Sequence, residues 1–311
     1  MSSDAPALSA IIISLNDEAT IARCVRAVVE QECPEPFEVI VVTSGHDRTA
    51  AIVREQFPQV TLIELPAPAL PGAARNAGLR VARGAYITFP GSHIELFPGS
   101  LAARLRAHRL GYPMVTGAAM NGTQTLAGWA SYFLDHSTHL PGQPPRVLRD
   151  PPVTCSYARE PLLALGGFPE DLRTGEDTTV NLALARAGYT AYQDPQIRFI
   201  HYSPCRTPWQ LVRHHFTRGR GAGRLLMERY RRERTESGIR PATVGRTLAD
   251  GLGVGRWPRA GSVVHLAEPV ERLTEPSGRV GDPSYEDAAI TRCRPFRACR
   301  ASIATRPRPA R

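Results

Sequence analysis

The sequence predicts an α/β fold, in which a mostly parallel sheet is flanked by helices. In the first hundred residues, short apolar runs alternate with segments of helical periodicity, and turn-forming residues separate the two. Strands that alternate with helices at this spacing indicate βαβ units and parallel pairing. Hydrophobic residues make up 42% of the 311 residues, which excludes a wholly disordered chain.

The expected elements follow in chain order. The apolar run at residues 9–15 is typical of a buried strand, and Asn16 or Asp17 is expected to cap a helix that continues to about Gln31. Later strands are short runs rich in Val, Ile or aromatic residues, and later helices repeat apolar residues every three or four positions. Further strands are expected at 37–42, 60–65, 85–89 and 197–201, and further helices at 47–57, at 98–109, at 177–187 and from Pro71 onward.

The charge of the chain is unevenly distributed. All 38 basic side chains are Arg, and residues 1–203 carry a net charge of −3 whereas residues 204–311 carry +12. Residues 8–230 are expected to form the folded domain, and the Arg-, Pro- and Gly-rich residues 235–311 a poorly ordered basic tail. A nucleic-acid-binding tail is the rival interpretation, but no basic patch interleaved with aromatic residues is present, so no nucleic-acid partner is expected.

The sequence also indicates a compartment. Six cysteines are scattered without paired C-x-x-C spacing, so neither a zinc site nor a disulfide framework is indicated. The first residues lack the positive charge of a signal peptide, and no stretch approaches the ~20 apolar residues that a membrane span needs. A cytoplasmic location is therefore expected.

Four segments carry a resemblance to a known family. They are Ile11–Glu18 (IIISLNDE), Phe37–Thr49 (FEVIVVTSGHDRT), Pro71–Gly84 (PGAARNAGLRVARG), and the pair Gly166–Pro169 (GGFP) and Gly175–Thr178 (GEDT). Their order and spacing resemble the family 2 glycosyltransferases, which have the GT-A fold. The resemblance implies transfer of a sugar from a nucleotide-diphospho-sugar donor to an acceptor, with inversion. A catalytically silent sugar-nucleotide-binding protein of the same fold is the alternative.

The resemblance also implies a catalytic pair, Glu176 and Asp177. Asp177 would be the general base that takes the proton from the acceptor hydroxyl. The pair follows Gly175 and opens an expected helix, where an anion is stabilised by the helix N-terminus. Simple helix capping is the alternative role for these two carboxylates.

Polar residues in the turns after the first two strands are candidates for binding the nucleoside. Ligands of such sheets bind beyond the carboxyl ends of the strands. Amide, hydroxyl and carboxylate groups suit a base edge and ribose hydroxyls, although residues of these types also cap helices. The candidates are Asn16, Glu18, Thr43, Ser44 and Asp47. Hydroxyls stand where the family usually carries an acidic residue, so the identity of the nucleotide stays open.

Arg75 is a candidate for binding the diphosphate. It lies among small residues that let the backbone approach a ligand, and its guanidinium can contact a phosphate through two hydrogen bonds. The alternative is an ordinary surface arginine on a helix.

The largest departure from the family is at its metal motif. Where the family carries D-x-D, this chain has Gly91-Ser92-His93, so both carboxylates are missing. Ser92 and His93 remain candidates for binding the donor. Three accounts stay open: Arg and His side chains neutralise the diphosphate, a metal is held by His93 and His201, or the chain binds without transferring. Mg²⁺ prefers oxygen ligands whereas Mn²⁺ accepts imidazole, and either ion is an open cofactor.

A basic segment follows the expected catalytic region. Gln210-x-x-Arg213 resembles the family's Q-x-x-R-W, and Arg213 and Arg218 are candidates for covering the diphosphate. A basic face that contacts solvent, or lies peripherally on the anionic inner face of a membrane, is an equal alternative for this segment. The acceptor is not specified and can be a glycan, a lipid or a small molecule. His136 and His139 are interpreted as ordinary loop histidines.

Overall fold

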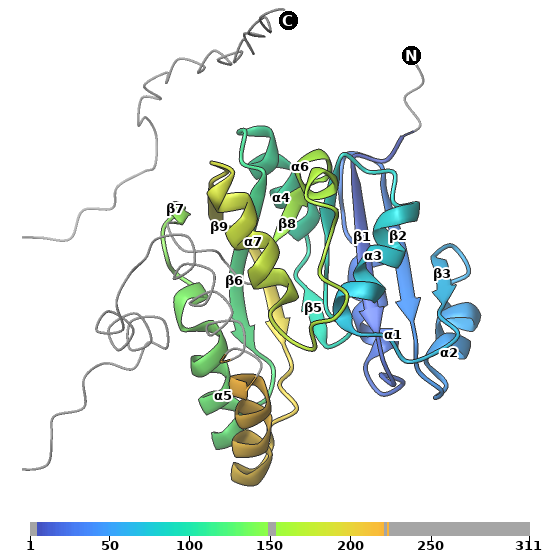
Figure 1. Cartoon of the computed structure of the whole chain (residues 1–311), viewed down its shortest axis with the longest axis vertical. Helices are drawn as coiled ribbons and strands as arrows, with labels where there is room; N and C mark the ends of the chain where they lie inside the picture. Colours follow the sequence, from blue (N-terminus) through green and yellow to red (C-terminus); the bar gives the residue numbers. More distant parts are fainter. Residues whose placement is uncertain (1–4, 149–153, 221–222, 224–311) are drawn as a thin grey trace, which may run out of the picture. The chain divides into compact units, whose positions relative to one another are not determined.

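The computed structural model of this chain describes residues 5–148, 154–220 and 223 (Figure 1). The chain divides into two units, residues 1–255 and 256–311, and every described residue belongs to the first. The tail expected at residues 235–311 therefore lies outside the described residues. None of the helices in the described part is long and apolar enough to cross a membrane.

The sheet runs in the order β3-β2-β1-β4-β8-β6-β9-β5, and β7 pairs with β9. Its first four strands are all parallel, as are β6 and β9, whereas β8, β5 and β7 pair in the antiparallel sense. The strands are β1 (Leu8–Ser14), β2 (Phe37–Thr43), β3 (Thr61–Glu64), β4 (Tyr86–Thr88), β5 (Ile94–Leu96), β6 (Met114–Asn121), β7 (Arg146–Leu148), β8 (Ser156–Ala158) and β9 (Ala191–His201). The predicted α/β class is confirmed.

Helices cover both faces of the sheet. They are α1 (Ile21–Val29), α2 (Thr49–Gln56), α3 (Pro71–Val81), α4 (Ser100–Arg109), α5 (Leu126–His136), the 3₁₀ turn η1 (Ser137–His139), α6 (Arg159–Ala164) and α7 (Glu176–Arg186). Side chains of α1, α2, α4 and α5 pack into one apolar cluster, and those of α3, α6 and α7 into another. The two clusters contain alternate residues of β1: Ile12 belongs to the first and Ile11 to the second. Burial on both faces explains why this strand is a continuous apolar run.

The first two helices begin later than the sequence predicts. The first starts at Ile21, Thr20 precedes it without a capping side-chain bond, and Asn16 adopts the left-handed backbone conformation (φ 58°). The expected cap by Asn16 or Asp17 is therefore wrong. Instead, Asp17 Oδ2 accepts the N–H of Leu15 at 3.0 Å, and Asn16 Oδ1 accepts the N–H of His46 in the turn after β2.

Two helices lie side by side at one end of the domain (Figure 1). One is α5, and the other is a helix over residues 208–220. Ser131 of α5 forms a 3.2 Å hydrogen bond with His215 of the second helix. The Tyr132 hydroxyl of α5 donates to the Ala119 carbonyl of β6 at 2.8 Å, which anchors α5 to the sheet.

A buried polar network joins α4 to the centre of the sheet. His108 lies stacked on Tyr86, with its Nδ1 2.7 Å from the Tyr112 carbonyl and its Nε2 2.8 Å from the Ser156 hydroxyl. Nδ1 must carry a proton, because it donates to the carbonyl. Nε2 can then accept a hydrogen bond only while the ring is neutral. The pKa of His108 is lowered to about 4, chiefly by burial; the Tyr112 bond opposes this shift and the nearby Arg104 adds to it.

This network predicts a loss of stability in mild acid. The unfolded chain binds a proton at His108 below pH 6.5, whereas the folded chain binds it only near pH 4, so stability falls as the pH drops between these values. Between pH 7 and pH 5, this proton uptake is expected to lower the unfolding free energy of the unaltered protein by about 2 kcal/mol. We expect that contribution to be absent in His108→Gln, as measured by urea denaturation. The matched control is His46→Gln, because His46 is exposed. An unchanged pH dependence in the His108 variant would contradict this assignment.

Candidate active site

The turns after β1 and β2 are bonded to one another. Ser44 donates its N–H to the Ser14 carbonyl at 3.1 Å, and Asn16 Oδ1 accepts the N–H of His46 at 2.9 Å. Thr43 and Ser44 are buried, whereas Asn16 is exposed. The structure thus brings the candidate nucleoside-binding residues of the two turns together at one edge of the sheet.

Carboxylates complete this connection. Asp47 Oδ2 accepts the N–H of Glu18 at 3.0 Å, and Glu18 Oε2 accepts the N–H of Arg48 at 3.1 Å. Desolvation acts to raise the pKa of Asp47, but hydrogen bonds from Thr49 and Glu18 outweigh it and lower this pKa. A carboxylate has about four lone-pair sites, so both side chains keep capacity for ribose hydroxyls.

The Gly91-Ser92-His93 turn lies beside the end of β1. Gly91 forms a parallel bridge with Ile13, and the thiol of Cys24 donates to the Ser92 carbonyl at 2.7 Å. Tyr202 donates its N–H to the His93 carbonyl at 3.1 Å. The turn is therefore tied both to the first half of the sheet and to the end of β9, and its position is fixed by backbone contacts.

Three histidine rings cluster at this point. The ring of His201 lies 4.9 Å from that of His93 and 4.6 Å from that of His136, measured between centroids. Burial lowers the pKa of His201 to about 2 and that of His136 to about 4. The His93 residue is exposed at the surface, but desolvation by the protein atoms near its ring lowers its pKa as well.

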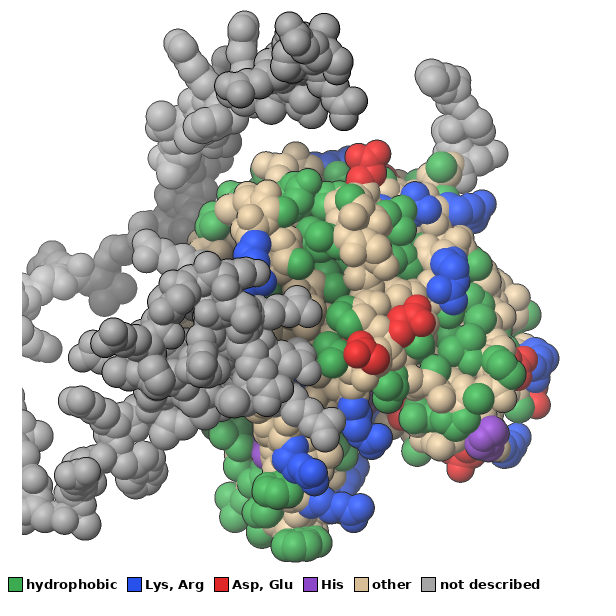
Figure 2. Space-filling model, in the orientation of Figure 1, with side chains coloured by type: hydrophobic (Ala, Val, Ile, Leu, Met, Phe, Trp, Pro, Cys, Tyr) green, Lys and Arg blue, Asp and Glu red, His purple; other side chains and the backbone are tan. Residues whose placement is uncertain are grey.

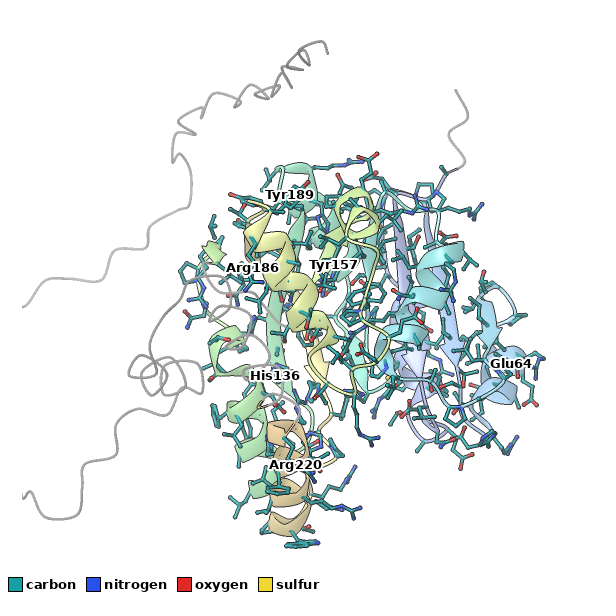
Figure 3. All side chains as sticks on the ribbon, in the orientation of Figure 1. Glu64, His136, Tyr157, Arg186, Tyr189 and Arg220 are labelled. Carbon is teal, nitrogen blue, oxygen red and sulfur yellow. The ribbon has the colours of Figure 1, made fainter. Side chains whose placement is uncertain are left out.

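The interpretation of His136 and His139 as loop histidines is wrong. Both are buried: His136 is the last residue of α5 and faces the sheet (Figure 3), and His139 closes the 3₁₀ turn. Both ring nitrogens of His136 are buried and have no hydrogen-bond partner among the described atoms. No local signal separates this histidine from one in a loop, because its ring partner His201 is 65 residues away in the sequence.

The residues at the D-x-D position do not fit a Mg²⁺ site. Gly91 has no side chain and His93 offers nitrogen, whereas Mg²⁺ requires near-octahedral oxygen ligands. His93 and His201 supply imidazole, which Mn²⁺ accepts. Among the described residues, however, no third metal-binding side chain converges with these two within 4.8 Å. The protein therefore supplies an incomplete ligand set for Mn²⁺ here.

A second group of candidate ligands lies nearby. The ligand atoms of Cys205, His214 and His215 lie within 4.8 Å of one another. The Cys205 thiol is 3.8 Å from the Gln210 carbonyl, and His215 Nε2 is 3.2 Å from the Ser131 hydroxyl. Two of the three groups thus already have protein partners, so the packing of the 208–220 helix accounts for their positions.

The N-terminus of α7 carries the candidate catalytic pair. Gly175 precedes it with φ 86°, a conformation that favours glycine, and Asp177 Oδ1 accepts the N–H of Thr178 at 2.7 Å. Glu176 is buried and forms an ion pair with Arg75 of α3. Burial raises the pKa of Glu176 even though Arg75 opposes this shift.

Arg75 is held in place by aromatic rings as well as by Glu176. Its guanidinium lies 5.6 Å from the centroid of Phe89 and 5.1 Å from that of Phe168. The Nε atom of Arg75 is buried and has no partner among the described atoms. Arg75 is therefore no ordinary surface arginine, because it connects α3 and α7 and retains one unused donor.

The two candidate arginines of the basic segment differ in their surroundings. Arg218 forms an ion pair with Asp135 of α5 at 3.6 Å, and its charge helps to lower the pKa values of His93 and His201. Arg213 is exposed. Arg218 is thus the one that the structure places in electrostatic contact with the histidine cluster.

The fold is that of a GT-A-like protein, and comparisons with known proteins agree. Residues 9–156, just under half of the chain, match the family model described as Glycosyl transferase family 2. The predicted resemblance to family 2 glycosyltransferases is thereby confirmed. A curated relative, "Uncharacterized protein MT1568" of Mycobacterium tuberculosis (strain CDC 1551 / Oshkosh), is 38% identical over 99 residues. That match covers 31% of this chain and 30% of the relative.

Solved structures with this fold include a mannosyltransferase. Mannosyltransferase PcManGT from Pyrobaculum calidifontis, in complex with GDP-Man and Mn²⁺, matches with a TM-score of 0.55 and 19% identity. That match covers 82% of this chain and 77% of the neighbour. S. aureus TarS 1-349 in complex with UDP is less similar, with a TM-score of 0.49, 19% identity and coverage of 66% and 62%. At 19% identity, the likeness to PcManGT shows the fold alone.

The buried Arg75–Glu176 pair predicts a characteristic pattern of stability. Removing one partner leaves a buried charge without compensation, so Arg75→Met or Glu176→Leu alone is expected to cost about 3–5 kcal/mol of unfolding free energy. The double variant is expected to cost much less than the sum of the two, because both charges are then absent. Urea denaturation of the four proteins measures this, and additive losses would contradict the coupling.

Proposed function

We propose that this chain transfers a sugar from a nucleotide-diphospho-sugar donor to a hydroxyl acceptor, with inversion at the anomeric carbon. The observation that carries the proposal is a chain of contacts between four segments. The turns after β1 and β2 are bonded to each other, and Gly91 is bridged to Ile13 of β1. Arg75 pairs with Glu176 of α7 and lies against Phe89, which leads into the Gly91 turn. The cross-bonded turns after β1 and β2 bind the nucleoside, the Gly91–His93 turn lies next to them, and the N-terminus of α7 presents Asp177. The GDP-Man in the mannosyltransferase neighbour supports the donor class.

The proposed chemistry is a single displacement. The acceptor oxygen attacks the anomeric carbon, and its proton passes to the Asp177 carboxylate. The bond from the anomeric carbon to the diphosphate oxygen breaks, and the nucleoside diphosphate leaves with the electron pair. Glu176 is a positioning residue, because its ion pair with Arg75 fixes the first turn of α7 on which Asp177 stands.

The negative charge that develops on the diphosphate must be stabilised in the transition state. Side chains of this protein can do so: the exposed part of the Arg75 guanidinium, the His93 ring, and the positive charge of Arg218 and Arg213. A bound Mn²⁺ would supply Lewis-acid stabilisation at the same place, with His93 and His201 as its ligands. The incomplete protein ligand set favours the cationic account.

A catalytically silent donor-binding protein is the second candidate. It is favoured by the loss of both carboxylates at the Gly91 and His93 positions. The intact carboxylate at Asp177 and the buried pair that supports it favour transfer, because binding alone needs no proton acceptor.

Removal of the proposed base tests the mechanism. Asp177→Asn keeps the size of the side chain and its contact with Thr178 but removes the proton acceptor. Transfer is expected to fall at least ~100-fold while donor binding changes little. Nucleoside-diphosphate release measures the rate and calorimetry measures binding. Asp171→Asn is the matched control, because Asp171 is exposed outside the site. Equal rates in the Asp177 variant and the unaltered protein would contradict the assignment of Asp177 as the general base.

Chelation tests the cationic account. Because a guanidinium cannot be chelated, activity is expected to persist in excess EDTA within about threefold, and Arg218→Ala is expected to reduce it by ~10-fold or more. The assay is again nucleoside-diphosphate release, with and without added Mn²⁺. Complete loss of activity in EDTA that Mn²⁺ restores would reject the cationic account and assign a metal to His93 and His201.

A further inference from the structure

Large exposed apolar side chains are concentrated on the two paired helices. Fourteen large hydrophobic residues are exposed in the described part of the chain, and half of them lie on α5 or on the 208–220 helix. They are Leu126, Trp129, Phe133, Leu134, Trp209, Val212 and Phe216, which we call the helix-pair surface. Figure 2 shows apolar side chains at this end of the domain, with basic ones among them. Single exposed apolar residues are common, but seven of them on two adjacent helices indicate an interaction site.

The spacing of these residues explains the patch. Trp209, Val212 and Phe216 recur at intervals of three and four, so they occupy one face of their helix. Leu126, Trp129 and Phe133 do the same on α5. The exposed fractions reach 91% at Leu126, 73% at Trp209 and 67% at Phe216, so these side chains gain little from the core of the domain. Folding alone does not account for this arrangement.

The charges around the helix-pair surface are positive. Arg206, Arg213 and Arg220 are exposed on or beside the 208–220 helix. The acidic residue of α5, Asp135, is paired with Arg218. Tryptophan and phenylalanine flanked by arginine is the composition of helices that lie in the interface of an anionic bilayer.

We propose that the helix-pair surface docks on an anionic lipid bilayer. This inference goes beyond the proposed transfer reaction and does not depend on it. The two helices are held together by the Arg218–Asp135 ion pair and by the contact between His215 and Ser131. Arg218 also acts electrostatically on His93 of the candidate site. Docking would therefore bring the site next to acceptors carried by the bilayer.

Tryptophan fluorescence tests the docking directly. The chain has three tryptophans, of which Trp129 and Trp209 belong to the helix-pair surface and Trp257 lies outside the described residues. In full-length Trp257→Phe, both remaining tryptophans therefore report on the surface. With vesicles of phosphatidylglycerol and phosphatidylcholine, we expect a blue shift and strong quenching by brominated acyl chains. An emission spectrum that vesicles and brominated lipid leave unchanged would overturn the proposal.

Co-sedimentation with the same vesicles identifies the groups responsible. Trp209→Ala combined with Phe216→Ala is expected to lower the partition constant at least ~10-fold, and Arg206→Glu combined with Arg220→Glu by a similar factor that salt reduces. The matched control is Leu110→Ala combined with Tyr189→Ala. These residues are 68% and 41% exposed, and Tyr189 lies at the opposite end of the domain from Arg220 (Figure 3).

Two other occupants of the surface give different results. If the basic residues 224–311 alone bound the vesicles, the Trp209 and Phe216 substitutions would leave the partition constant unchanged, and the proposal would be wrong. If a second copy covered the surface, sedimentation velocity without lipid would show a dimer that these substitutions dissociate, which would also overturn it. A monomer without lipid supports docking.

Discussion

The buried ion pair between Arg75 and Glu176 is the interaction on which the candidate site depends. It joins α3 to the first turn of α7, two helices that pack on the same face of the sheet but lie a hundred residues apart in the sequence. The rings of Phe89 and Phe168 also lie against the guanidinium. Because Asp177 follows Glu176 directly, this contact sets the position of the proposed base relative to the sheet edge.

The sequence was sufficient for the parallel half of the fold. Strands β1 and β2 are apolar on both faces, so their positions are predicted to within a residue. The starts of α1 and α2 were predicted too early: Asp17 accepts the N–H of Leu15 instead of capping α1, and Asp47 accepts the N–H of Thr49, the residue at which α2 begins. Strands β5, β7 and β8 have only three residues each, which is too short for a periodic signal.

Parts of the site were predictable, and others were not. The sequence motifs predicted that Asn16, Glu18 and Asp47 lie together at one edge of the sheet, where the two turns are bonded to each other. His136 was not found, because its burial next to His201 depends on the packing of α5 against β6 and β9. Likewise, the pairing of Arg75 with Glu176 is a tertiary contact that the spacing of residues in the sequence does not predict.

The central claim is that this domain still transfers sugar although the metal-binding carboxylates at Gly91 and His93 are gone. A screen of nucleotide-diphospho-sugars with the full-length protein tests it most directly, with nucleoside-diphosphate release and the anomeric configuration of the product as readouts. The account predicts that at least one donor is consumed in the presence of an acceptor and that the product is inverted. A donor that binds but is never consumed, with any acceptor and with or without Mn²⁺, would contradict it.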